Sequence, residues 1–174
     1  ISKQFTNKVS QRKWPGHRDQ YQYAADLTTY PWIMFIDADE EVPPELAEEI
    51  QRELGGRVAD VDGFFIRRRT YHLGRWILHG GWYPEGEIRL YRRDKGKWQG
   101  GLHAKVAVKG KVRSLNYEYL HYTYRDISHQ IQTLNQYSQI AAEEMDQQGE
   151  LFSLFKLFFH PAFRFIKEYL LRLG

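Results

Sequence analysis

The sequence predicts an α/β domain followed by a helical extension at the C-terminus, and three observations lead to this prediction. A run of apolar residues at 32–36 predicts a buried strand between two helical segments. From residue 62 onward apolar residues alternate with polar ones, which is typical of strands. Helical segments return near Asp126. This order indicates an α/β domain over residues 1–124 and a helical segment over residues 125–174.

Two helices are expected to flank the first strand. Residues 17–29 form the first, which ends at Tyr30-Pro31 because the residue before a proline disfavours helical backbone. Residues 32–36 are apolar at every position, as in a parallel or central strand. The second helix begins at Pro43-Pro44, since proline is tolerated in a first helical turn, and it ends at Gly55-Gly56.

Three further strands and two helices are predicted in the second half of the chain. The strands are "DGFFIRRRT", "EIRLYRR" and "AKVAVKGKV", which alternate wholly or in part. Gly-rich or polar turns, "HLGRWILHGGWYPEG" and "DKGKWQGGLH", separate them. Helices follow over about 126–148 and 151–173, with Gly149 between them.

Composition excludes several kinds of protein. The 174 residues contain no cysteine, which rules out disulfides, thiolate metal sites and a cysteine nucleophile. The sequence lacks a run of about 18 apolar residues, so no membrane-spanning helix is expected. Between Arg67 and Arg113 there are 13 lysines and arginines but 3 acidic residues. This basic middle segment indicates an anionic partner, or alternatively a solvated basic face.

A carboxylate cluster directly follows the first predicted strand. Asp37 and Asp39 are two residues apart, so a turn can aim both at one ion, and Glu40 and Glu41 come next. In open α/β sheets, ligands bind beyond the carboxyl ends of strands. Mg²⁺ and Mn²⁺ prefer oxygen ligands and commonly share them with substrate phosphates. The cluster therefore predicts a divalent cation, Mn²⁺ or Mg²⁺, bound together with a diphosphate.

Three other interpretations of these acids are available. Acidic residues are common at a helix N-terminus, which explains Glu40 and Glu41 better than it explains two aspartates directly after a strand. A calcium loop has the right acidic spacing, but it requires glycine where this chain has Val42. Phosphoryl transfer through an aspartyl nucleophile is the third interpretation, and the basic middle segment gives it no specific support.

Three blocks of sequence resemble the family 2 glycosyltransferases of the GT-A fold, and most closely the lipopolysaccharide-core glucosyltransferase type. The blocks are "WIMFIDADEEVPPEL", "GGWYPEGEIRLYRRDKGKWQGGLHAKV" and "LHYTYRDISHQIQTLNQYSQIAAEEM". The resemblance implies a Rossmann-like GT-A domain and a UDP-sugar donor. It also implies a DxD motif in which Asp39 binds the metal and Asp37 lies near the ribose or the diphosphate.

The resemblance also implies that the GT-A domain is partial. GT-A enzymes begin with a strand–helix–strand unit that binds the nucleotide base, and this chain begins after that unit. We expect an additional N-terminal segment of roughly 80 to 100 residues, the size of a βαβ unit with its connections. Without that unit, the sheet should expose an edge through which two chains could associate.

Catalytic residues are expected in the second block. Glycosyl transfer with inversion needs a base that deprotonates the acceptor hydroxyl. Glu85 and Glu87 are the acids of the "YPEGE" turn; Glu85 matches the acid of the family motif and is favoured, with Glu87 as the rival. Trp82, beside them, is a candidate for stacking on a sugar ring. The alternative for the two glutamates is that they are ordinary polar turn residues.

Positive charge is needed to bind the diphosphate, and the same block supplies it. Arg89, Arg92 and Arg93 are candidates for the diphosphate or an acceptor phosphate, because guanidinium suits bidentate contacts with oxyanions. His103 could complete the metal site, although Ala104 stands where relatives often carry an acid. The alternatives are solvated strand positions for the arginines and a structural role for the histidine.

The C-terminal segment has an amphipathic pattern. On a helical wheel the basic residues Lys156, Arg164 and Lys167 lie opposite a face rich in Phe and Leu, and Pro161 is expected to kink the helix. This pattern is typical of a helix lying in a membrane interface. The alternative is a helix packed on its own domain.

Together these features predict an inverting, metal-dependent glycosyltransferase. It would move a hexose, with glucose favoured, from a UDP-sugar to a lipid-linked or lipopolysaccharide-core acceptor. It would act as a peripheral protein on the cytoplasmic face of the bacterial inner membrane. The alternative is a non-catalytic basic module that binds membrane surfaces. A nucleic-acid partner is not expected, because no nucleic-acid motif is present and the acids around Asp37 oppose it.

Overall fold

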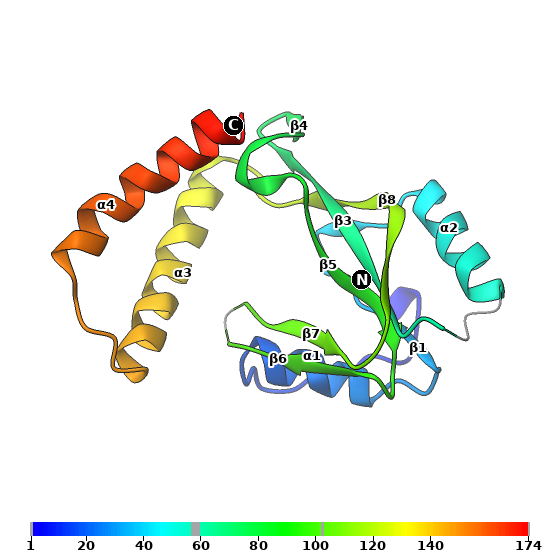
Figure 1. Cartoon of the computed structure of the whole chain (residues 1–174). Coiled ribbons are helices and arrows are strands. Elements are labelled where there is room, and N and C mark those ends of the chain that lie inside the picture. Colours follow the sequence, from blue (N-terminus) through cyan, green and yellow to red (C-terminus); the bar gives the residue numbers. More distant parts are fainter. Residues whose placement is uncertain (1, 57–59, 102, 174) are drawn as a thin grey trace.

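The computed structural model describes residues 2–56, 60–101 and 103–173. A curved central sheet has helix α2 on one side, and helix α1 lies with a small two-stranded sheet on another (Figure 1). Helices α3 and α4 extend away from the sheet at the C-terminal end of the chain (Figure 1). The predicted α/β domain with a C-terminal helical extension is confirmed. Its arrangement of strands and helices is consistent with a partial GT-A domain.

The central sheet has the strand order β1-β5-β3-β8-β2, and β4 pairs with β3. Among the described residues β3 and β8 run parallel and the other paired strands antiparallel. A separate hairpin consists of β6 and β7. The strands are β1 (Trp32–Met34), β2 (Glu40–Glu41), β3 (Gly63–His72), β4 (Arg75–Ile77), β5 (Glu85–Arg92), β6 (Gly96–Gln99), β7 (Lys105–Val108) and β8 (Val112–Tyr122).

The helices lie close to their predicted positions. Helix α2 begins at Pro44, where proline occupies the first turn, and ends at Gly55, as predicted. Helix α1 ends three residues earlier than predicted, because the Thr28 hydroxyl donates to the carbonyl of Ala25 and closes the last turn. The helices are α1 (His17–Asp26), α2 (Pro44–Gly55), α3 (Ile127–Gln147) and α4 (Leu154–Phe165), with shorter helical turns η1 (Ser2–Gln4), η2 (Gly80–Trp82) and η3 (Ile166–Leu171).

The strand predictions need three corrections. Strand β1 is a short antiparallel edge strand and not a parallel or central one. Strands β4 and β6 lie inside segments predicted as turns, and β5 begins at Glu85, so Glu85 and Glu87 lie in a strand and not in a turn. Strand β8, the longest of the sheet, lies mostly beyond the predicted strand that ends at Val112.

Two apolar clusters explain why β1 is apolar on both faces although it is an edge strand. One cluster, between the sheet and α2, includes Leu46, Phe64 and Leu90, and Trp32 and Met34 pack against it. The other, between the sheet, α1 and the β6–β7 hairpin, includes Ile33 and Trp98. Each face of β1 therefore contributes to a different core.

A buried glutamate fixes α2 to the sheet. Both carboxylate oxygens of Glu49 accept the backbone N–H of Asn116 at 3.0 Å, and one also accepts the backbone N–H of Tyr117. The Asn116 amide donates to the same carboxylate at 2.7 Å. Burial alone would raise the pKa of Glu49, but these hydrogen bonds outweigh it and the net shift is downward.

The C-terminal helices pack loosely on the domain. Among their described residues, α3 and α4 bury no side chain. The end of the segment nevertheless contacts the turn before β5, because the backbone N–H of Gly80 donates to the carbonyl of Arg172 at 2.8 Å. Within the described chain, no helix combines the length and the apolar character that crossing a bilayer requires.

We expect Glu49→Gln to lower the free energy of unfolding by about 2–4 kcal/mol, because an amide replaces a buried, multiply hydrogen-bonded carboxylate and turns a donor toward backbone N–H groups. Glu48→Gln is the matched control, since Glu48 is exposed on the same helix, and it should change stability by less than about 0.5 kcal/mol. Urea unfolding followed by circular dichroism measures both.

The difference in stability between the wild type and Glu49→Gln should also depend on pH. The lowered pKa of Glu49 in the folded state stabilises the fold above the ordinary value of 4.5, and this contribution is lost as the pH falls below that value. Equal unfolding curves for the wild type and Glu49→Gln at neutral pH would contradict the assignment.

Candidate active site

A cavity of about 580 Å³ lies where the loop after β1 meets β5 and β8. A volume of this size suits a small organic ligand. Side chains from most of the elements around the sheet contribute to it, including one from α3. The lining consists of His17, Tyr21, Phe35, Asp37, Glu40, Arg68, Glu85, Gly86, Glu87, Arg89, Trp98, His103, Ala104, Lys105, Tyr119, His121 and Tyr137.

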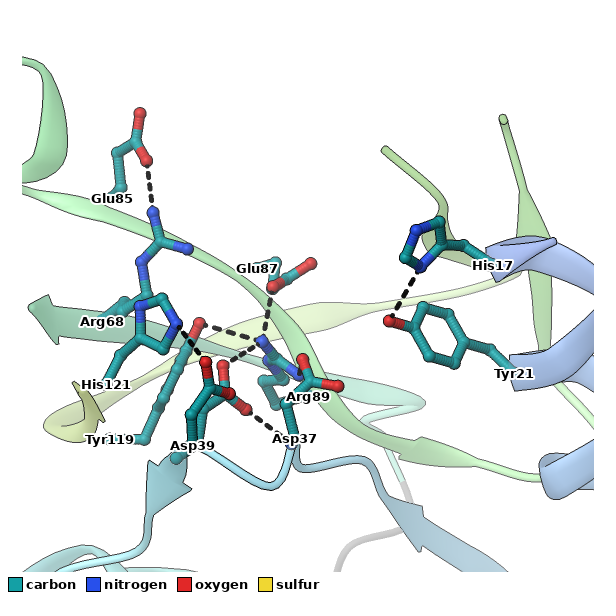
Figure 2. A network of polar contacts seen from close by, with 11 residues as sticks. His17, Tyr21, Asp37, Asp39, Arg68, Glu85, Glu87, Arg89, Tyr119 and His121 are labelled. Carbon is teal, nitrogen blue, oxygen red and sulfur yellow. Dashed lines mark hydrogen bonds and ion pairs between the residues drawn. The ribbon is translucent and has the colours of Figure 1, made fainter. Parts of the chain in front are cut away.

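Arg89 is the centre of a carboxylate cluster at the base of this cavity. Figure 2 shows its guanidinium between Asp37 and Glu87. The distances are 2.5 Å from Nη2 to Glu40, 2.8 Å to Glu87, and 3.4 Å from Nη1 to Asp37. The phenol oxygen of Tyr119 also accepts from Nη2, at 3.3 Å. In this structure the guanidinium of Arg89 therefore balances the negative charge of three carboxylates of the site.

The protonation of this cluster follows from its burial. Burial alone would lower the pKa of Arg89, but Tyr119, Glu87 and Glu40 outweigh it, and the guanidinium stays charged. Burial raises the pKa of Glu40, although Arg89 opposes the shift. Burial also raises the pKa of Tyr119 to about 12, so its hydroxyl is protonated at neutral pH.

Asp39 lies outside the Arg89 cluster and contacts His121 instead. Its carboxylate lies 3.4 Å from Nε2 of His121, and this contact is the main reason why the pKa of Asp39 is lowered (Figure 2). The strand register brings the two residues together, because Glu40 of β2 pairs with His121 of β8. The other ring nitrogen, Nδ1, is buried without a hydrogen-bond partner among the described residues. His121 and His103 both line the cavity, and the assignment of His103 to the metal site stays a prediction.

The fit of a divalent cation rests on Asp39 and His121. The described residues contain no group of three or more His, Asp or Glu arranged to hold a metal ion. Asp39 and His121 nevertheless supply one carboxylate and one imidazole beside the cavity. A Mg²⁺ site usually takes one or two carboxylates and completes its shell with water and substrate phosphates. The pair fits a cation that arrives together with a diphosphate.

Glu85 and Glu87 both line the cavity from strand β5. Being two residues apart on a strand, they point to the same face. Glu85 lies 2.8 Å from Arg68 and its side chain is 48% exposed, whereas Glu87 pairs with Arg89 and is 25% exposed. Gly86 between them leaves no room for a side chain, because a Cβ atom there would lie 2.4 Å from the carbonyl oxygen of Ile66. This glycine allows β5 to approach β3 closely enough to form the site.

Residues 2–109 of the chain match the sequence profile of the family described as glycosyl transferase family 2. The chain belongs to this family. The predicted family membership is confirmed.

The family 2 chain is similar to several bacterial proteins. The lipopolysaccharide core biosynthesis glycosyltransferase LpsC of Rhizobium meliloti is 29% identical over 164 residues, which cover 90% of this chain and 58% of that protein. The uncharacterised glycosyltransferase RT0209 of Rickettsia typhi is 26% identical over 189 residues, covering 99% of this chain and 63% of its own length. A Rickettsia felis glycosyltransferase is also 26% identical, with 65% of its length covered. The chain thus spans about three fifths of the length of these curated relatives.

The family 2 domain brings some of the predicted site residues together and leaves others apart. Asp37, Glu85, Glu87, Arg89 and His103 line one cavity, and Asp39 adjoins it through His121.

Three predicted substrate-binding residues lie away from this cavity. Arg92 lies over the ring of Trp32, and Arg93 donates to the carbonyl of Thr28. Trp82 packs edge-on against His72. Their roles in binding substrate stay predictions.

The sequence analysis missed several polar residues of the site, chiefly those on β8. Tyr119 and His121 point to the same face of that strand, and Arg68 belongs to the neighbouring β3. A usable signal was present in "YLHY", where alternate residues are polar-tipped and face one side of a strand. This pattern becomes informative only when residues 119–122 are recognised as part of a strand that pairs beside the DxD loop.

Proposed function

We propose that this family 2 domain is the metal-binding and catalytic part of an inverting glycosyltransferase. Its donor is a UDP-sugar carrying a hexose, with glucose favoured, and its acceptor is a lipopolysaccharide core or another lipid-linked saccharide. The observation that supports this most directly is that one cavity contains the first aspartate of the DxD motif and both glutamates of β5, with the second aspartate beside it. The name of the Rhizobium relative supports the choice of acceptor.

Asp39 and His121 would hold a Mn²⁺ or Mg²⁺ ion, and Asp37 would lie toward the ribose or the diphosphate. When bound, such an ion supplies Lewis-acid stabilisation of the negative charge that develops on the departing diphosphate. His103 and Lys105, which also line the cavity, come from the β6–β7 hairpin. The imidazole of His103 and the ammonium group of Lys105 are suited to donate hydrogen bonds to the oxygens of the diphosphate.

Glu85 is the better candidate for the base. In a single displacement, the acceptor oxygen bonds to the anomeric carbon as the bond from that carbon to the diphosphate oxygen breaks. UDP leaves with the bonding electrons, and a carboxylate takes the proton of the acceptor hydroxyl. Both glutamates pair with an arginine at 2.8 Å, but Glu85 is about twice as exposed as Glu87, and its partner Arg68 is 26% exposed whereas Arg89 is buried. An acceptor that enters from solvent therefore reaches Glu85 more easily.

Membrane contact through α4 and η3 is the second part of the proposal. Phe155, Phe158 and Phe163 are 64–68% exposed, and the described residues of α4 bury no side chain. The basic residues Lys156 and Arg164 lie on the same helix, which favours a bilayer with anionic headgroups over a neutral one. The same exposed aromatic surface would serve the alternative function, that of a non-catalytic module which binds membrane surfaces. The proposed location is the cytoplasmic face of the inner membrane.

We expect Asp39→Asn to abolish Mn²⁺-dependent binding of UDP while leaving the circular dichroism spectrum unchanged, because it removes a charged ligand at a half-exposed position. His121→Ala should weaken the same binding about tenfold or more, since metal-site histidines contribute at this scale. Asp94→Asn is the matched control, because Asp94 is exposed in the turn after β5. Isothermal calorimetry of UDP with and without Mn²⁺ measures the effect.

Equal affinities of the wild type and Asp39→Asn for UDP in the presence of Mn²⁺ would exclude the metal assignment. Vesicle binding without UDP binding by the wild type would favour the non-catalytic alternative.

Glu85→Gln should reduce kcat by about 10²–10⁴-fold while donor affinity changes little, because a base acts in the chemical step. Glu87→Gln should have the smaller effect on kcat. Steady-state kinetics with a UDP-hexose, and calorimetry with UDP, separate the two quantities. The reverse pattern, with kcat lost in Glu87→Gln and kept in Glu85→Gln, would assign the base to Glu87.

Phe158→Asp should reduce binding to vesicles with anionic lipid at least about tenfold, since a charged residue replaces an aromatic one in the membrane interface. Leu27→Asp is the control, because Leu27 is 55% exposed but lies at the end of α1. Co-sedimentation with phosphatidylcholine vesicles, with and without phosphatidylglycerol, measures the binding. If Phe158→Asp sediments with the vesicles as the wild type does, α4 is not the membrane contact.

A further inference from the structure

Arg89 was selected from the sequence as a ligand of the diphosphate, but its surroundings are those of an internal residue. Its side chain is 5% exposed. The guanidinium lies over the rings of Phe35 and Tyr119, with its central carbon 5.1 Å and 4.8 Å from their centroids. Its two terminal nitrogens are engaged by Asp37, Glu40, Glu87 and Tyr119. An arginine that recognises a phosphate needs its planar fork turned toward the ligand, and here the fork is occupied by the protein.

The partners of Arg89 belong to four different segments. Asp37 comes from the loop after β1, Glu40 from β2, Glu87 from β5 and Tyr119 from β8. The loop is closed on itself as well, because the second oxygen of Glu40 accepts the backbone N–H of Asp37 at 2.8 Å. The guanidinium therefore joins Asp37 of the loop after β1 to Glu87 of β5 (Figure 2).

The charge balance makes this connection strong. Asp37, Glu40 and Glu87 would repel one another at the base of the cavity, most strongly at Glu40, whose side chain is buried. A buried ion pair contributes little net stability compared with apolar residues, but loss of one partner leaves uncompensated buried charges and is strongly destabilising. The Arg89 guanidinium contacts all three carboxylates, so it can hold them side by side before any metal or substrate is bound.

We propose that Arg89 is a positioning residue for the transfer reaction, an inference that rests on the proposed function. Its guanidinium holds Asp37 and Glu87 in fixed relative orientation through a three-way contact, and it does not bind the diphosphate. Lysine cannot replace it, because an ammonium group is a point charge that cannot present a planar fork to Asp37 on one side and to Glu40 and Glu87 on the other. Glu40 is part of the same device, since it binds both the guanidinium and the backbone of Asp37.

The kinetic test compares Arg89→Lys with Arg75→Lys, a control at an exposed position on β4. Arg89→Lys keeps the positive charge and should fold, yet kcat should fall about 10–100-fold with the donor KM changed less than about threefold. Arg75→Lys should match the wild type in both constants. A donor KM that rises with kcat unchanged would show that Arg89 binds the diphosphate and would overturn the proposal. Wild-type kcat in Arg89→Lys would overturn it too.

A second measurement tests the contact itself and does not require transfer activity. Arg89→Met should lower Tm by about 10 °C, as expected for breaking a buried ion cluster in a domain of this size. Adding Glu40→Gln to Arg89→Met should recover roughly half of that loss, because a carboxylate without its partner has been removed. Additive effects of the two substitutions would show that Arg89 does not balance Glu40, and the inference would fail. If the effects of Arg89→Met and Glu40→Gln are not additive but the wild-type protein transfers no sugar, then the proposed function fails while the contact stands.

Discussion

The contact on which the site depends is that of the Arg89 guanidinium with Asp37, Glu40 and Glu87. Three carboxylates from two separate segments meet in a region where charges are poorly solvated, and without a cation the loop after β1 could not approach β5. Since that loop also leads into β2, the same contact fixes where Asp39 meets His121. The geometry of the DxD motif is thus determined from outside the motif.

Strand β8 supplies partners to acidic residues throughout the domain. Asn116 and Tyr117 bind Glu49 of α2, and His121 contacts Asp39. Glu118, which is itself buried, pairs with Arg69 at 2.8 Å and accepts the Tyr83 hydroxyl at the same distance. A strand in the interior of a sheet is well placed for this role, because it has a neighbouring strand on each side, here β3 and β2.

The sequence was sufficient for features that depend on local pattern. The bounds of α2 follow from Pro44 and Gly55, and the position of Asp37 follows from an apolar segment that ends just before it. The pattern could not show that β1 is an edge strand, because an edge strand between two cores is apolar on both faces just as a central one is. Nor could it show that Arg89 is buried while Arg92 lies elsewhere, since both are arginines of one strand. Their difference arises from the loop that folds over one end of β5, a tertiary contact between residues about fifty positions apart.

The parallel pairing of β3 with β8 has a consequence for synthesis of the protein on the ribosome. Glu49 finds its partner 67 residues later in the chain, and Arg89 finds Tyr119 30 residues later. The carboxylate of Glu49 therefore emerges before its hydrogen-bond donors, and β3 cannot complete its pairing with β8 until residue 122 has left the exit tunnel. Pairings this distant in sequence form late and slowly. During that interval the nascent chain carries exposed apolar strands and unpaired carboxylates, which is the state in which a chaperone would encounter it.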